Sequence, residues 1–151
     1  MNIESMFKLY DPNKFGANLL IFHTNYKKFL NVELANYGLN LIQALCLVII
    51  NREGNLNQKE LADNLFLTKG AITKAINKLE NEVLVFREKS EIDKRNYVLN
   101  TTKKGEKLSI EIFEINRKWE REMGLKELPG EFEEIFKQLA LRSIELNFKL
   151  E

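Results

Sequence analysis

The residues with the clearest chemistry lie along one predicted helix, residues 69–82, "KGAITKAINKLENE". Its apolar residues recur at three- and four-residue steps and define an inner face: Ile72, Ala75, Ile76 and Leu79. The outward face then carries Lys69, Gly70, Thr73, Lys74, Asn77 and Lys78. Lysines neutralise phosphates or donate to guanine O6 and N7, and asparagine can bond N6 and N7 of adenine. This face is typical of a helix that contacts nucleic acid. The alternative interpretation is an ordinary solvated helix with scattered lysines.

The start of this helix adds groups that can hold a phosphate. Thr68 precedes the first turn and is predicted to cap it. The hydroxyls of Thr68 and Thr73, with the first backbone amides, are suited to phosphate oxygens. Gly70 has no side chain, so a nucleic-acid strand could come close to the backbone there.

A second set of charges lies in "KSEIDKRN", residues 89–96, between strand-like stretches at 83–87 and 97–101. Lys94 and Arg95 at a hairpin tip could enter a minor groove, where narrow A·T tracts concentrate negative potential. Asp93 could orient Arg95 by a charge-assisted bond, and Lys89 would add phosphate attraction. A merely solvated turn is the alternative here.

The elements that must position these residues are predicted by capping and periodicity. Residues 57–65 open with Asn57 and Glu60, the spacing of a capping box, and a short turn separates them from the helix at 69–82. Two short helices joined this way are typical of a helix-turn-helix, and a hairpin directly after it is a wing. Long helices are predicted at 13–36 and beyond 103, and an almost wholly apolar helix at 39–50 belongs in the core.

The terminal helices carry more aromatic residues than one small winged helix can bury: Phe15, Phe22, Phe29, Trp119, Phe132 and Phe136. A large apolar surface is rare on a monomer, so we expect a homodimer. A two-fold dimer would bind a pseudo-palindromic site with half-sites about 34–36 Å apart.

Composition sets broader limits. The chain of 151 residues has a net charge of +1, but residues 55–107 carry eleven Lys/Arg against eight Asp/Glu, which favours an anionic partner for the middle of the chain. The longest apolar run, 41–50, is too short for a membrane span, and no secretory signal is expected. A single cysteine, Cys46, suits a reducing cytoplasm.

The sequence shows no phosphate loop, carboxylate pair or catalytic triad, so we do not expect an enzyme. Neither a metal site nor a cofactor is expected. Cys46 lies in an apolar helix, where a thiol is usually inert packing, and His23 is a lone histidine beside Phe22. A role of His23 in a ligand pocket stays open, although a surface or interface position is the simpler interpretation.

Residues 57–108 resemble the winged-helix core of MarR-type transcriptional regulators. The motifs that carry this resemblance are "ELA" before the turn, "AITKAINKLE", "LVFR", Asp93-x-Arg95 and Thr102-x-x-Gly105. The resemblance implies a homodimer with recognition helices in successive major grooves and wings in the flanking minor grooves. It also implies a small, often phenolic or anionic, effector that releases DNA.

The chain departs from the family pattern at the end of the recognition helix. Val83 stands where a glycine is usual, and because valine fits the left-handed conformation poorly, we expect a different helix exit. Lys74 and Lys78 replace common arginines, and Asn77 replaces a common aspartate. Lysine lacks the bidentate fork of arginine, so the family's base preference should not carry over.

We therefore predict a mainly α (α+β) winged helix-turn-helix with a two-stranded β wing, as one domain over 1–151. Residues 39–102 form the DNA-binding core, and 13–36 and 104–151 the dimerisation helices. The predicted function is a ligand-responsive dimeric repressor that binds double-stranded DNA. The alternative is a winged-helix protein-interaction module without DNA binding.

Overall fold

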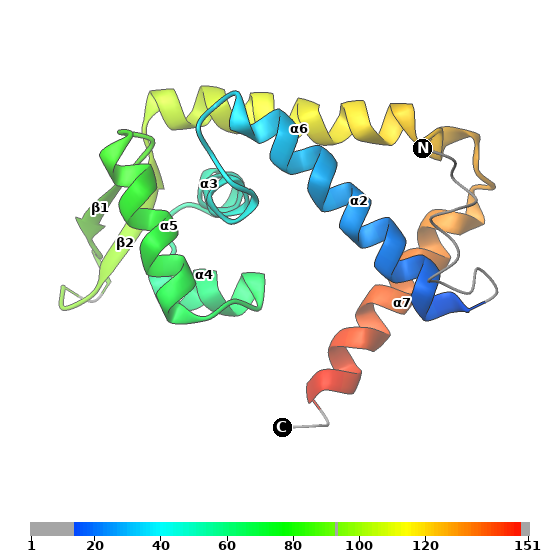
Figure 1. Cartoon of the computed structure of the whole chain (residues 1–151). Coiled ribbons are helices and arrows are strands. Elements are labelled where there is room, and N and C mark those ends of the chain that lie inside the picture. The colour runs from blue at the N-terminus through cyan, green and yellow to red at the C-terminus, as the bar shows by residue number, and fades with distance from the viewer. Residues whose placement is uncertain (1–13, 93, 149–151) are drawn as a thin grey trace. The chain divides into compact units, whose positions relative to one another are not determined.

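The computed structural model describes residues 14–92 and 94–148, which divide into two compact units between Asn116 and Arg117. The first unit contains α2 (Phe15–Ala35), α3 (Leu41–Glu53), α4 (Gln58–Leu65), α5 (Lys69–Asn81), β1 (Val85–Lys89) and β2 (Tyr97–Thr101) (Figure 1). Helix α6 (Lys103–Glu122) begins in the first unit and ends in the second, which also holds the 3-10 helix η2 (Leu125–Glu127) and α7 (Glu131–Phe148).

The first unit confirms the predicted winged helix-turn-helix. Strands β1 and β2 form an antiparallel hairpin in which Val85 pairs with Thr101 and Lys89 with Tyr97. Leu56, just before α4, adds an isolated antiparallel bridge to Leu99. The predicted start of the first strand at residue 83 is wrong by two residues, because residues 82–84 form the exit from α5.

The predicted capping box of α4 is confirmed. The side chain of Asn57 accepts from the amides of Lys59 (2.9 Å) and Glu60 (3.0 Å), and Glu60 Oε2 accepts from the Asn57 amide at 2.8 Å. A second capping box, between Asn40 and Gln43 at the start of α3, escaped the sequence analysis. These caps satisfy backbone donors that a helix start leaves without partners.

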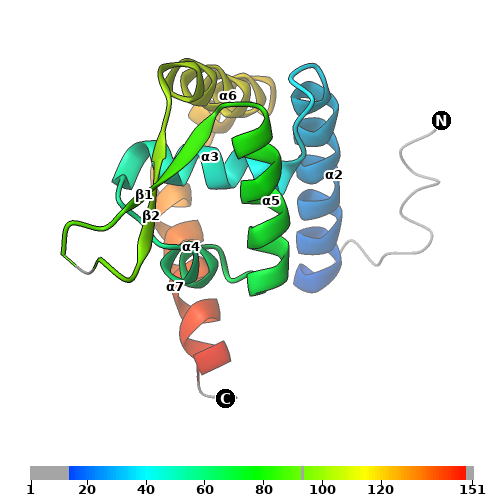
Figure 2. The ribbon, with the colours of Figure 1, turned by 90° about the vertical axis from the view of Figure 1, so that its left-hand side faces the viewer.

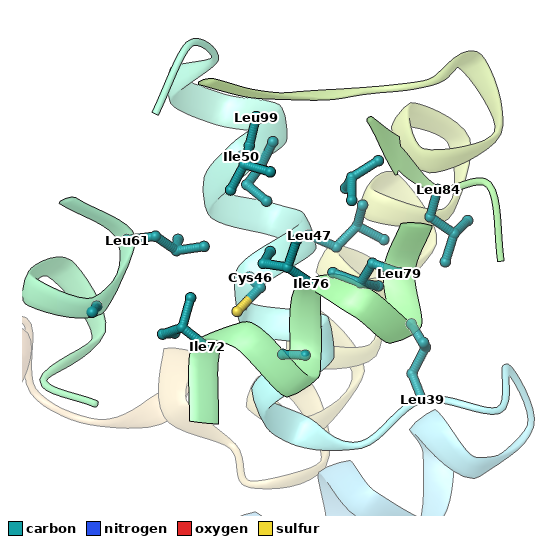
Figure 3. Packing of buried hydrophobic residues seen from close by; sticks show 13 residues of the cluster. Leu39, Cys46, Leu47, Ile50, Leu61, Ile72, Ile76, Leu79, Leu84 and Leu99 are labelled. Atoms are coloured by element: carbon teal, nitrogen blue, oxygen red, sulfur yellow. The ribbon is translucent and has the colours of Figure 1, made fainter. Parts of the chain in front are cut away.

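The predicted core position of the apolar helix is confirmed for α3. Cys46, Leu47 and Ile50 are buried on this helix, and their side chains pack among buried residues of α4, α5 and the hairpin (Figure 3). The predicted inner face of α5 completes this core: Ile72, Ala75, Ile76 and Leu79 are all buried. The recognition helix is thus fixed to the core along one side, and its other side remains open.

Burial also decides the chemistry of Cys46. Desolvation raises the pKa of its thiol to about 12, so the reactive thiolate is scarce near neutral pH. This supports the interpretation of Cys46 as inert packing.

A smaller cluster joins α2 to α3 and α6 within the first unit. Leu30 and Leu34 of α2 pack with Ala44 of α3 and Ile115 of α6. The Tyr26 hydroxyl donates to Asn116 Oδ1 at 2.8 Å. The second half of α2 is therefore part of the intrachain core.

The exit from α5 corrects our expectation for Val83. The residue adopts the left-handed conformation, with φ of +57°. The amide of Val83 donates to the Glu80 carbonyl (2.9 Å) and that of Leu84 to the Leu79 carbonyl (2.9 Å), the two bonds of a Schellman motif. Leu79 and Leu84 are both buried, and this long-range packing holds a β-branched residue in a backbone conformation that it disfavours.

The next turn of chain locks this exit to α6. The Thr102 hydroxyl lies 2.8 Å from the Val83 carbonyl and accepts from the Gly105 amide at 3.1 Å. A Cβ atom on Gly105 would lie 2.0 Å from the carbonyl oxygen of Leu84, so only glycine fits. This contact gives the Thr102-x-x-Gly105 motif its physical reason.

In the second unit, residues 131–147 of α7 are all exposed or half-buried. Six large apolar residues of this stretch are exposed, among them Phe132 and Phe136, whose rings stack with centroids 5.9 Å apart. None of the helices in the described parts of the chain has the length and apolarity to cross a membrane.

Candidate nucleic-acid interface

The start of α5 and the turn of the β1–β2 hairpin lie on the same side of the first unit. In Figures 1 and 2, which differ by a rotation about the vertical axis, both lie below the level of the start of α6, which is at the top of the first unit. The charged turn and the exposed end of the recognition helix can therefore approach one partner together.

The first turn of α5 is open. The Thr68 side chain accepts from the Ala71 amide at 3.3 Å, which confirms the predicted cap. Thr68, Lys69 and Gly70 are exposed, and a Cβ atom on Gly70 would meet no atom within 4 Å. Helix geometry leaves the first amides without intrahelical partners, so this end offers donors and a positive dipole to an anion.

Farther along α5, the predicted residues differ in how free they are. Lys74 is exposed. Thr73 is half-buried, and its hydroxyl lies 2.9 Å from the Lys69 carbonyl and 3.3 Å from Gln58 Oε1. Because its hydroxyl already has partners, Thr73 is a weaker candidate for contact than the sequence indicated.

Lys78 lies in the last turn of the same helix. Its Nζ donates to Glu82 Oε1 at 2.7 Å, and the hydrogen bond and charge of Lys78 lower the pKa of that carboxyl. The charge of Lys78 is thus partly matched within the helix, and Lys69 and Lys74 dominate the open face.

Arg87 on β1 is a residue whose role the sequence analysis missed. Its Nη2 donates to Asn77 Oδ1 at 3.2 Å and lies 3.2 Å from Glu80 Oε2. The signal was present in the alternation of the strand, because Arg87 follows Val85 by two residues and shares its face. Arg87 therefore connects the wing to Asn77, a predicted base-reading residue.

The hairpin exposes the other predicted cations. Lys89 ends β1, and Lys94 and Arg95 lie in the turn, all three exposed. The Ser90 amide donates to the Asn96 carbonyl at 2.9 Å and closes the turn. Asp93 lies outside the described residues, so its predicted bond to Arg95 stays a prediction.

A cleft of about 410 Å³ separates the hairpin from the recognition helix. It is lined by Gln58, Thr73, Asn77, Arg87, Tyr97 and Leu99. The amide, hydroxyl and guanidinium groups give this cleft a polar wall next to the open face of α5.

Metal chemistry has no support among the described residues, where no three His, Cys, Asp or Glu side chains gather as a metal site would require. His23 lies in an open depression on α2 with Lys27 and Lys28. The depression is formed by one helix face alone, which gives a small ligand little enclosure.

The capped helix pair, the packed recognition helix and the adjoining hairpin define the class of winged helix-turn-helix proteins. Residues 39–97 match the MarR family model. The HTH-type transcriptional regulator SarZ of Staphylococcus aureus is 32% identical to this chain over 101 residues, which cover 67% of this chain and 68% of SarZ. The chain belongs to the MarR family.

Solved structures agree with this assignment. A MarR transcriptional regulator from Methanosarcina mazei Go1 is 28% identical, with a TM-score of 0.75 over 90% of this chain and 97% of its own. A MarR-family protein from Listeria monocytogenes, solved with a 26mer DNA, has a TM-score of 0.76 over 89% of each chain. At 22% identity, the second likeness concerns the fold alone. The chain is accordingly a transcriptional regulator and not an enzyme.

Proposed function

We propose that this regulator binds double-stranded DNA as a homodimeric repressor, with α5 in a major groove and the β1–β2 turn in the adjoining minor groove. The observation that carries the proposal is the open first turn of α5 on the same side of the unit as the cations of the hairpin. A DNA complex of a structural neighbour supports it. The relationship to SarZ, a transcriptional regulator, favours this function over a protein-interaction module.

The proposed contacts follow from exposure. In this proposal the exposed Thr68, Lys69 and Gly70 hold phosphate with side chains and first-turn amides. The exposed Lys74 and Asn77 reach base edges. Lys78 and Thr73, which already have intrahelical partners, come second. In the wing, Lys89, Lys94 and Arg95 supply positive charge, with Asp93 proposed to orient Arg95.

The first test is a titration of the protein with duplex DNA from the region upstream of its own reading frame, at several salt concentrations. Neutralised phosphates release counterions, so the affinity should fall steeply as salt rises. A protein-interaction module would show no binding, or binding insensitive to salt.

The wing is tested by Arg95→Ala, compared with Arg52→Ala. Arg52 is an exposed arginine at the end of α3, paired with Glu53 at 2.6 Å and outside the proposed interface. Arg95→Ala should weaken DNA binding. It should also reduce the slope of log affinity against log salt concentration by about one, because one positive charge near the phosphates is lost. Equal behaviour of both variants would contradict a wing contact.

Exposed apolar surface supports the homodimer. Phe15, Leu19 and Leu20 project from the first half of α2, and α7 exposes Ile135 and Leu139 among others. A monomer rarely leaves so much apolar surface in water. The double substitution Ile135→Glu/Leu139→Glu should give a folded monomer in analytical ultracentrifugation and abolish tight DNA binding; an unchanged dimer would place the interface elsewhere.

A small phenolic or anionic effector completes the proposal. A cleft of about 350 Å³ beside the end of α5 is lined by the apolar side chains of Leu84 and Leu108, and its charged lining consists of Lys104 and Lys107 together with Glu82 and Glu111. Lys104 also donates to the Glu82 carbonyl at 2.8 Å, so an anion there would compete for a bond that holds the helix exit. Salicylate, as a probe, should weaken DNA binding of the wild type and not of Lys104→Met/Lys107→Met. The effector site lies elsewhere if both respond alike.

A further inference from the structure

The contact between Arg87 and Asn77 fixes which end of the Asn77 side-chain amide faces the wing. Guanidinium groups can only donate hydrogen bonds, whereas an asparagine side chain has one accepting and one donating end. The nitrogen Nη2 of Arg87 lies 3.2 Å from Asn77 Oδ1, so the oxygen end of this amide must face the wing. The donating end, Nδ2, then faces away from Arg87.

The arginine is itself held in place. Its Nη2 also lies 3.2 Å from Glu80 Oε2, three residues after Asn77 on the same face of α5. One such nitrogen carries two hydrogens, one for each acceptor. The side chains of Arg87 and Glu80 are only 34% and 25% exposed, so protein rather than water surrounds most of this pair.

The donating end of Asn77 remains available. Asn77 is exposed, and its Nδ2 makes no hydrogen bond to any residue that the structure describes. The side chain also lines the cleft between α5 and the hairpin, next to the predicted base-reading face.

We propose that Arg87 is a positioning residue that sets base preference, because it fixes Asn77 as a hydrogen-bond donor toward the major groove. This inference rests on the proposed DNA binding of α5. A group that presents only donors is best matched by guanine, which offers the acceptors O6 and N7, or by thymine O4, because adenine has its N6 donor beside its one acceptor, N7. The two-bond pairing of asparagine with adenine needs both ends of the amide, and Arg87 occupies the accepting end.

The test compares the sequences that wild type and Arg87→Met select from a pool of randomised DNA duplexes. Wild type should enrich guanine or thymine at one position in each half-site. In Arg87→Met the amide is free to turn, and adenine should replace that base. In binding assays on matched duplexes, the preference at this position should shift by about tenfold, the size of one base contact, with the other positions unchanged.

Two further variants separate positioning from structural support. Arg87→Lys keeps a donor and a charge and should retain the wild-type base, and Arg52→Met, which removes an arginine from a different exposed ion pair, should also retain it. Urea unfolding of each variant reports any loss of stability separately from base preference. If Arg87→Met binds more weakly but selects the same base at every position, Arg87 is only structural and the inference fails.

A different result would remove the premise. If wild type enriches no sequence and shows no salt-dependent binding, the proposed DNA binding itself is wrong. The variant Asn77→Ala identifies the base position that Asn77 reads, because the preference at that position should disappear. If wild type selects adenine there, DNA binding stands and the orientation assigned to Asn77 is wrong.

Discussion

The two ends of the recognition helix α5 are built in opposite ways. At its first turn, Thr68 supplies one cap, and a Cβ atom on Gly70 would meet nothing within 4 Å. At its exit, Val83 is held in the left-handed conformation, and a Cβ atom on Gly105 would collide with the Leu84 carbonyl. Gly70 has free space where a side chain would project. At Gly105 that space is filled by backbone, so glycine is required there.

This difference indicates a division of roles along a single helix. The open end leaves amides and exposed lysines available to a partner, and the closed end fixes the angle at which the helix leaves the core. Cores tolerate little added volume because they are packed as densely as organic crystals. Substitutions at the closed end should therefore change stability, whereas those at the open end should change binding.

The largest effect should come from Gly105→Ala. The new methyl group would lie 2.0 Å from a backbone oxygen, and backbone cannot yield as a flexible side chain can. We expect a loss of about 3 kcal/mol in the free energy of unfolding, at the upper end for an overpacked site. Urea unfolding measures it. A much smaller loss would show that the backbone at the exit from α5 can move to accommodate the methyl group.

A smaller loss should follow from Thr102→Val, with Thr102→Ser as its matched control. Valine keeps the shape but loses the hydroxyl that contacts the Val83 carbonyl and the Gly105 amide. The loss of a cap and a hydrogen bond predicts about 1–2 kcal/mol in urea unfolding. Serine keeps the hydroxyl and should lose clearly less. Equal losses would mean that the methyl group contributes as much as the hydrogen bonds.

Val83→Gly should act in the opposite direction. The left-handed conformation costs a β-branched residue about 1–2 kcal/mol, and the greater freedom of glycine in the unfolded chain offsets part of the gain. Val83 is 63% exposed, so little packing is lost. We expect a stabilisation of about 0.5–1 kcal/mol. A destabilised variant would mean that the valine side chain contributes more at this exit than its exposure indicates.

The sharpest contrast between stability and binding should come from Gly70→Ala. Alanine favours helix over glycine by about 1 kcal/mol or less, and nothing obstructs the methyl group. DNA binding should nevertheless weaken, because the methyl group would stand between the first-turn backbone and a phosphate. Anisotropy titrations compared with urea unfolding separate the two effects. Unchanged affinity would remove Gly70 from the proposed interface.

Local features of this chain could be predicted because each depends on neighbours in sequence. The capping box of Asn57 and Glu60 spans three residues, and the cap at Thr68 contacts an amide three residues ahead. The buried face of α5 follows from its helical period. These patterns located the helix-turn-helix and the hairpin, and with them the order of the fold.

The remaining features depend on contacts between distant segments. Val83 was expected to avoid the left-handed conformation, but the packing of Leu79 and Leu84 and the bond from Thr102 hold it there. Asn77 is the corresponding case in the proposed interface, since Arg87 reaches it from the next element of the fold.

The sequence by itself determined which elements form, where the two capped helices α4 and α5 begin, and which residue types face outward along α5. Only the tertiary structure decided which of those outward groups are free. Lys69 and Lys74 are exposed, Thr73 and Lys78 already have partners, and Asn77 is turned by the wing. The physical reason is that a helical period fixes a direction from the axis, whereas hydrogen-bond partners and steric limits come from whatever the rest of the chain packs beside it.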